Sequence, residues 1–495
     1  MFDLLHFLIV NRDRVVSRDE IFQSVWRGRI VSDSVLGNRI NAARRAIGDD
    51  GTQQRLIRTL RRNGFRFVGT VQETTHRATP YATPLSLPRR RLASVIKNSP
   101  GVLVLPFVDG DGGKDREAFA EWLGYEVTAA LSELGWLSVF AGRSWSDAHG
   151  MLREPQQIER KLGVRYVLRA RMRRADGRLR LITQLVNARG DHVLLSERFE
   201  GDVEDASRVR QVADRIASSV GHRIFAAENR RTQLKSPESF TAWESMIRAL
   251  ALINSRRKQN LGAAHALLRR AIAIDPNSAP AHSLLSFVAS LSVHMGFRSR
   301  EPVRAFALHA AQRAVALDAE EPWAHLALGY ARLYTCNQVE EALTHLGCGL
   351  RLDPDLAVGH YLLALASIYA GRAADAFAHA ADAERSAPRD LLAHGNPGVH
   401  DNVRATACFS LGRHDEGVAF ARKAILQNPR QVPAYRQIVN NSAFAGDVET
   451  ARWALQNVTR LSPDVQRFLK ESSTMWSRRE DFQKMVEAFR IAGLR

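Results

Sequence analysis

Residues 354–388 read PDLAVGHYLLALASIYAGRAADAFAHAADAERSAP, and this stretch carries the pattern that governs the C-terminal half of the chain. Two runs of helical period, divided at Gly371, end at Pro388. Small residues such as Ala376 and Ala383 recur along the second run, as expected where two helices cross closely. The stretch therefore predicts a packed pair of helices.

The same pattern recurs through the C-terminal half. The ends of successive helix pairs align at intervals of 43, 35, 34, 41 and 34 residues, at Pro276, Ala319, Pro354, Pro388, Pro429 and Pro463. A 34-residue period with short insertions is typical of tetratricopeptide repeats. Residues 236–463 thus resemble a tetratricopeptide (TPR) α-solenoid, and residues 464–495 are expected to form C-terminal capping helices. The resemblance implies a concave surface that binds a protein segment or another copy of the chain.

The N-terminal segment combines a helix start, an amphipathic helix and a hairpin. Ser17-Arg18-Asp19-Glu20 is a capping box, in which hydroxyl and carboxylate satisfy backbone donors at a helix start. A second helix beginning near Ser32 places four apolar residues on one buried face: Leu36, Ile40, Ala43 and Ile47. Asn63-Gly64, between short apolar-alternating runs at 56–59 and 65–68, predicts a β-hairpin.

In this order, over residues 1–71, these features resemble the OmpR/PhoB-type winged helix-turn-helix domain of bacterial regulators, a family related to phosphorelays. The resemblance implies that the helix enters the major groove of double-stranded DNA and that the hairpin reaches the minor groove. It places DNA-binding residues on both elements: Asn38, Arg39, Asn41, Ala42, Arg44, Thr59, Arg61 and Arg62.

The resemblance also implies what each of these residues would contact. Asn38, Asn41 and Ala42 would face base edges, because an Asn amide can pair with adenine. Arg39, Arg44 and Thr59 would meet phosphate or sugar, and Arg61 and Arg62 would lie on the wing. The family opens with a small N-terminal sheet. Met1 falls inside the first predicted helix, so we expect this sheet to be missing, through either a clipped domain or a start assigned too late.

Between the two ends lie a linker and a smaller domain. Residues 72–100 hold four prolines and a basic Arg89-Arg90-Arg91 cluster, which is linker composition. Residues 101–226 alternate strand-like and helix-like runs and predict a small α/β domain with three antiparallel strands near its end. The motifs VLPF and GVRYVLRARMRR resemble the TolB-like amino-terminal domain, which implies a fold and no reaction.

Composition limits the class of protein. A formal charge of +18 points to a polyanionic partner, and three cysteines without a paired motif give neither a disulfide framework nor a zinc site. No run of residues is long and apolar enough to span a membrane, so we expect a cytoplasmic protein without membrane contact. The Gly112-Gly113-Lys114 turn lacks the first glycine and the hydroxyl residue of a phosphate-binding loop.

Three functions remain to be weighed. The first is a multidomain DNA-binding transcription regulator that has no catalytic residues, cofactor or metal and is compatible with a homodimer on DNA. The second is a TPR scaffold whose clipped winged helix does not bind DNA. The third is an enzyme, since relatives of the C-terminal architecture can carry a nucleotide-cyclase module. However, the sequence offers no suitable setting for the paired metal-binding aspartates of that module, and the winged helix occupies the N-terminal position.

Overall fold

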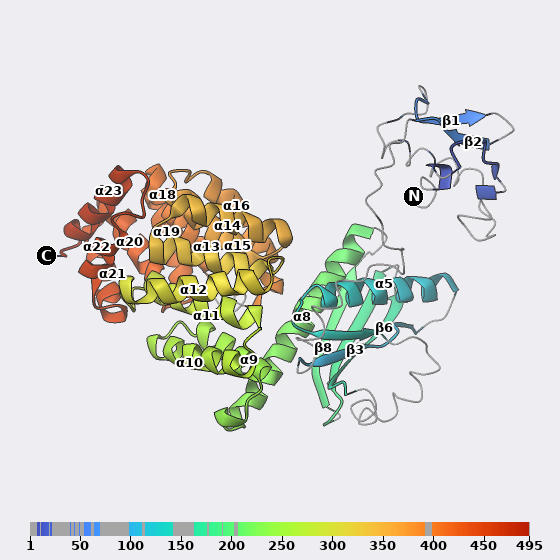
Figure 1. Cartoon of the computed structure of the whole chain (residues 1–495), viewed down its shortest axis with the longest axis horizontal. Helices are drawn as coiled ribbons and strands as arrows, with labels where there is room; N and C mark the ends of the chain where they lie inside the picture. Colours follow the sequence, from blue (N-terminus) through green and yellow to red (C-terminus); the bar gives the residue numbers. More distant parts are fainter. Residues whose placement is uncertain are drawn as a thin grey trace. The chain divides into compact units, whose positions relative to one another are not determined.

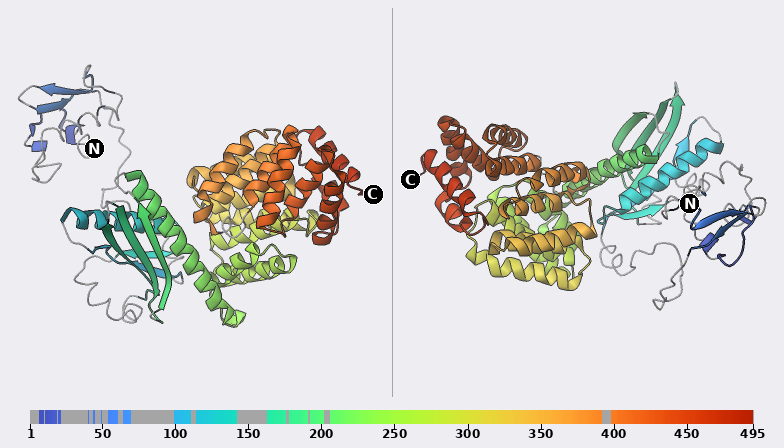
Figure 2. Two further views of the ribbon diagram at one scale, coloured as in Figure 1. Left: turned by 180° about the vertical axis from the view of Figure 1, so that it is seen from behind. Right: turned by 90° about the horizontal axis from the view of Figure 1, so that it is seen from above.

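The computed structural model describes two compact units, Met1–Leu87 and Pro88–Arg495, shown in Figures 1 and 2. The described residues are 7–9, 11–18, 20–21, 40, 44, 49, 54–60, 64–69, 99–110, 114–141, 163–175, 178–190, 192–201, 206–391 and 398–494. Among them, no helix has the length and apolarity that crossing a membrane requires.

A hairpin lies at the centre of the N-terminal unit. Strands β1 (Ile57–Leu60) and β2 (Gly64–Phe67) pair antiparallel, with Ile57 opposite Phe67 and Leu60 opposite Gly64. The predicted hairpin is confirmed, with both strands displaced by one residue. Gly64 has a φ of +130°, and an added Cβ would lie 2.0 Å from the carbonyl oxygen of Val16. Only glycine fits where the chain at Val16 pairs with β2 so closely.

The capping box is also confirmed. The Ser17 amide donates to Glu20 Oε2 at 2.8 Å, and the Glu20 amide donates to Ser17 Oγ at 3.2 Å. Of the predicted apolar stripe, Ile40 is buried in the unit's core beside Ile57, whereas Leu36, Ala43 and Ile47 lie outside the described residues.

The second unit begins with a mixed β-sheet. Its strands are β3 (Gly101–Val104), β4 (Val108–Asp109), β5 (Ser138–Ala141), β6 (Tyr166–Ala175), β7 (Arg178–Asn187) and β8 (His192–Gly201). The order is β5-β3-β6-β7-β8, with β4 also paired to β6. Strand β3 runs parallel to β5 and β6, while β6, β7 and β8 form the predicted antiparallel set.

Two helices cover one face of this sheet. Helices α5 (Lys114–Ser132) and α8 (Ala206–Gln233) pack against each other across the strands (Figure 1). Their apolar sides, including Leu123, Val127 and Ile216, join Leu168 and Leu185 of the sheet in one core. The helix predicted near 203–225 thus exists and runs eight residues further.

The C-terminal part is a stack of helix pairs that ends in two further helices. The bounds are α9 Ala242–Asn254, α10 Lys258–Ile274, α11 Ala279–His294, α12 Glu301–Leu317, α13 Pro322–Cys336, α14 Val339–Leu352, α15 Ala357–Tyr369, α16 Asp375–Ser386, α18 Val399–Leu411, α19 His414–Gln427, α20 Val432–Phe444, α21 Val448–Leu461, α22 Val465–Ser472 and α23 Arg479–Ile491. Short 3-10 turns lie at Pro237–Ser239 and Ala387–Arg389. Each helix packs on its partner and on the next pair, as TPR-like repeats do.

The alanine pattern of the sequence marks the close crossings. Six alanines at equivalent places on the second helices are fully buried: Ala264, Ala271, Ala307, Ala314, Ala376 and Ala383. In three of the loops between pairs, a histidine of the following helix bonds back to the loop. His282, His325 and His360 donate Nε2–H to the carbonyl six residues earlier, at 3.1, 2.9 and 2.8 Å. This bond closes each loop in the same way.

Contacts between distant repeats close the stack on its inner side. Arg436 of α20 donates to the carbonyls of His294 and Met295 at the end of α11, at 2.9 and 3.0 Å. The amide of Arg300, just before α12, meets the Glu471 carboxylate of α22 at 3.2 Å. As a result, α11 and α13 bury residues on nearly all sides.

Candidate functional site

The structure describes two of the predicted DNA-contacting residues, Arg44 and Thr59. The other six lie outside the described residues: Asn38, Arg39, Asn41, Ala42, Arg61 and Arg62. Their contacts with base edges, phosphate and the wing stay predictions.

Arg44 is buried, unlike an arginine that is open to contact phosphate. It is 5% exposed, and its Nη2 donates to the Ile57 carbonyl and to Thr59 Oγ1, both at 2.8 Å. Nearby, Asp49 accepts from the amides of Leu56 and Ile57 at 3.0 and 2.9 Å. Both side chains therefore position β1, and this burial argues against a direct bond from Arg44 to DNA.

The hairpin instead presents two arginines that the sequence prediction missed. Arg58 and Arg66 stand directly opposite each other in the β1–β2 register. Arg58 is exposed, and Arg66 is half-buried with Nε donating to the Arg12 carbonyl at 3.1 Å. Like charges facing each other on one strand pair destabilise the pair, which favours a nearby anion. The period-2 alternation of residues 57–60 and 64–67 was the signal that could have found them.

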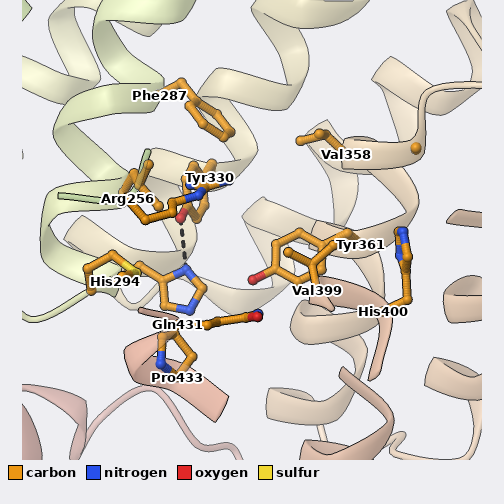
Figure 3. Close-up of a pocket in the computed structure, with 13 residues that line it drawn as sticks. Arg256, Phe287, His294, Tyr330, Val358, Tyr361, Val399, His400, Gln431 and Pro433 are labelled. Atoms are coloured by element: carbon orange, nitrogen blue, oxygen red, sulfur yellow. Dashed lines mark hydrogen bonds between the residues drawn. The ribbon is translucent and has the colours of Figure 1, made fainter. Parts of the chain in front are cut away.

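A second candidate site is a cavity inside the helical array (Figure 3). Its walls come from the first helix of five successive pairs and from the loop before α10. Phe287, His294, Tyr330, Tyr361 and Gln431 line it together with Arg256 of that loop. The space that can hold the centre of a water molecule is about 30 Å³, which suits a small guest.

The polar groups on one wall of this cavity are bonded to one another. His294 Nδ1 lies 2.8 Å from the Tyr330 hydroxyl, and its Nε2 lies 3.2 Å from the Tyr334 hydroxyl. Burial, reinforced by the charges of Arg436 and Arg256, holds the pKa of His294 well below its ordinary value, so the ring is neutral. A neutral His294 adds no charge to the cavity.

A cluster of possible metal ligands lies on the pair α15–α16. One ligand atom each from His360, His379 and Asp382 lies within 4.8 Å of the others. The His360 Nε2–H bond to Pro354 leaves Nδ1 as the free acceptor, 3.9 Å from Asp382 Oδ2. Two imidazoles and a carboxylate can hold a zinc-like ion, although Asp382 also pairs with Arg385 at 2.5 Å. Sequence spacing alone does not bring the three residues together, because His360 lies on α15 and the other two on α16.

The cysteines offer no reactive centre among the described residues. Cys408 is fully buried, and burial raises its pKa to about 11. Cys336 and Cys348 are half-buried free thiols.

Comparison with known proteins places the N-terminal segment in a family. Residues 1–67 match the model described as "Transcriptional regulatory protein, C terminal". The phosphate regulon transcriptional regulatory protein PhoB of Escherichia coli (strain K12) is 34% identical over 67 residues, 13% of this chain and 29% of PhoB. The chain thus carries an N-terminal winged helix of the OmpR/PhoB type.

Two further likenesses cover larger shares of the chain. A candidate adenylate cyclase of Rhizobium meliloti (strain 1021), designated number 3, is 29% identical over 234 residues, which are 47% of this chain. The chain covers 40% of that protein's length. The TPR protein TTC0263 of Thermus thermophilus superposes with a TM-score of 0.31 at 20% identity, covering 42% of this chain and 100% of TTC0263.

Proposed function

We propose that the protein is a DNA-binding transcription regulator whose winged helix reads duplex DNA and whose TPR-like array binds a protein partner. The match of residues 1–67 to the DNA-binding part of transcriptional regulators carries this proposal. The opposed Arg58 and Arg66 on the hairpin and the +18 charge of the chain support it electrostatically.

The parts of this proposal that go beyond the family rest on the sequence pattern. The recognition helix would place Asn38, Asn41 and Ala42 in the major groove, and Arg61 and Arg62 on the wing. The sheet region would be a TolB-like domain that relays or senses a signal in the cytoplasm. The partner segment would bind the concave face. Binding there would compete with the contacts of Arg436 with the end of α11 and of Arg300 with Glu471.

The first experiment asks whether the chain binds DNA through its basic residues. Binding of the full chain to duplex DNA should weaken steeply with salt, because arginines release counterions from the phosphates. A fragment of residues 1–100 should keep most of this affinity, and residues 236–495 should not. Equal affinity of the two fragments at moderate salt would favour the scaffold without DNA binding.

The second experiment separates base reading from phosphate contact. Asn41→Ala should cost about 1–3 kcal/mol on the preferred sequence and little on random DNA. Arg39→Ala should weaken binding to all sequences alike and lower the salt dependence. Identical losses for both variants on both DNAs would refute the assignment of the recognition helix.

The likeness to a candidate adenylate cyclase leads to one further test. We propose that the chain itself has no cyclase activity, because the sequence offers no suitable pair of metal-binding aspartates. Incubation of the full chain with ATP and Mg²⁺ or Mn²⁺ should give no cyclic AMP. Cyclic AMP that forms only when the chain is present would contradict this proposal and show a catalytic role.

A further inference from the structure

Two arginines are buried deep inside the helical array, and they differ in what they contact. Arg436 is 4% exposed, and its two terminal nitrogens are occupied by the carbonyls of His294 and Met295. Its guanidinium also lies over the ring of Phe468 at 3.4 Å. Arg256 is 8% exposed, lines the cavity, and its guanidinium forms no hydrogen bond or ion pair with any described residue. Both Nε atoms lack a partner among the described residues, but only Arg436 has acceptors for its terminal nitrogens.

Among the described residues, no carboxylate compensates for this charge. Within the described residues, the groups that act electrostatically on Arg256 are the phenols of Tyr330 and Tyr361, and burial lowers its pKa. His294 is neutral, and Arg436 adds a second positive charge nearby. A buried cation without an anion is strongly destabilising, so the site is electrostatically incomplete.

The position of Arg256 adds a backbone cost. Arg256 lies in the loop between α9 and α10 with a φ of +52°, in the left-handed region that non-glycine residues rarely adopt. Arg256 is therefore a strained arginine at the cavity, with no hydrogen-bond or ion-pair partner for its guanidinium in the described part of the chain. Such a residue is explained if an anionic guest occupies the space beside it.

The cavity also supplies hydrogen-bonding groups opposite the arginine. Figure 3 shows the polar ends of Tyr361 and Gln431 facing the space that Arg256 and Tyr330 border. Gln431 Oε1 is buried without a partner, as is Nδ1 of His400 at the edge. Tyr361 and His400 are only half-buried, which marks the side where a guest can enter.

The remaining lining is apolar and limits the size of the guest. Leu291, Met295, Val358 and Val399 surround the polar end of the cavity. A tetrahedral inorganic anion would leave this apolar surface uncovered, whereas a carboxylate with a short hydrocarbon part would cover it. Arginine binds carboxylates with two parallel bonds, which suits the planar group.

We propose that this cavity binds a small organic carboxylate, with Arg256 as its counter-ion and the Tyr361 hydroxyl as a further hydrogen-bond donor. The site is separate from the DNA-binding residues and does not depend on the proposed function.

The test is thermal unfolding and calorimetric titration of the full chain with acetate, butyrate and inorganic phosphate, each against sodium chloride at equal ionic strength. Butyrate should bind saturably and raise the melting temperature, and acetate should bind more weakly because it covers less apolar surface. Arg256→Gln should weaken butyrate binding about tenfold or more. Tyr361→Phe, which keeps the ring, should weaken it less.

The matched control is Arg257→Gln, which removes the neighbouring exposed arginine. It should bind butyrate as the wild type does. Without ligand, Arg256→Gln should melt no lower than the wild type, because it removes an unpaired buried charge, and this shows that the variant is folded.

Several outcomes would overturn the proposal. These are no butyrate binding by the wild type, equal binding by Arg256→Gln, or an equal loss in Arg257→Gln. Phosphate binding as tight as butyrate would contradict the apolar part of the site. Arg256-dependent binding of an acidic peptide without binding of free carboxylates would identify a peptide site instead.

Discussion

At the scale of single residues, buried charges with complete sets of partners hold both units together. Arg44 ties its helical segment to β1 through Ile57 and Thr59, while Asp49 caps the amides at the start of the same strand. In the second unit, Glu228 of α8 accepts from Arg165 at 2.5 Å, from the Tyr166 hydroxyl at 2.7 Å and from Arg231 at 2.7 Å. Each of these side chains connects elements that sequence patterns treat separately.

The first prediction separates structure from DNA contact at Arg44. Arg44→Ala should destabilise the fragment 1–87 by about 1.5–3 kcal/mol, because the buried Ile57 carbonyl loses a charged donor. Thr59→Val, which removes one acceptor only, should cost less. Thermal unfolding measures both. If Arg44→Ala loses DNA affinity while its melting temperature is unchanged, Arg44 contacts phosphate as the sequence predicted.

The second prediction concerns acid stability at Glu228. Burial raises the pKa of this carboxyl, but the charge of Arg165, the Tyr166 hydroxyl and Arg231 outweigh it, so the pKa lies below its ordinary value of 4.5. The stabilisation is therefore complete above about pH 4.5 and is lost as the pH falls through the lowered value.

Glu228→Gln should remove this pH dependence and cost about 3 kcal/mol at neutral pH, since it removes the carboxylate that pairs with Arg165 and one of the two that pair with Arg231. Denaturant unfolding between pH 3 and 7 measures both effects. A parallel pH profile for wild type and variant would contradict the assignment of Glu228.

At the scale of elements, small side chains set the distance between paired helices. Ala376, Ala380 and Ala383 of α16 are all buried against neighbouring helices, while Ala378 on the same helix is more exposed. We therefore expect α16 to accept a larger side chain on the side of Ala378 and not on the side of Ala376, Ala380 and Ala383.

The third prediction uses this contrast. Ala383→Leu should overpack the crossing and cost about 1–3 kcal/mol, whereas Ala378→Leu should change stability little. Chemical denaturation of the full chain gives the comparison. Equal effects of the two substitutions would mean that α16 does not pack as described.

At the scale of the whole molecule, the sheet region and the array share an ion-pair network. Arg231 of α8 pairs with the Glu244 carboxylate of α9 at 2.7 Å, and Lys235, in the turn after α8, pairs with it at the same distance. Trp136, beside the sheet, stacks on Trp243 of α9 with ring centres 5.9 Å apart. The array is then closed by Arg436 and by Arg300 with Glu471.

The fourth prediction tests this closure. Arg436→Met should leave the carbonyls at the end of α11 without donors, and amide exchange should quicken around residues 295–300 and 463–472. DNA affinity should not change, because residues 1–87 form a separate compact unit. Loss of DNA binding in this variant would mean instead that the closed array supports the DNA-binding form, for example as a dimer.

The sequence alone determined the features that depend on near neighbours in the chain. The Ser17–Glu20 capping box, the hairpin around Asn63-Gly64 and the alanine crossings all arise from local hydrogen bonds or from contacts between successive helices. These features therefore appear as short-range patterns in the sequence. The order of winged helix, sheet region and helical repeats could be predicted from those patterns.

Only the tertiary structure decided the contacts that join distant residues. Arg436 meets His294 across 142 residues, because small rotations between repeats add up until the stack closes on itself. No local sequence pattern shows how these rotations accumulate. For the same reason, the sequence left Arg44 among the DNA contacts. It also gave no sign that Arg256 lies buried at a cavity with no carboxylate partner among the described residues.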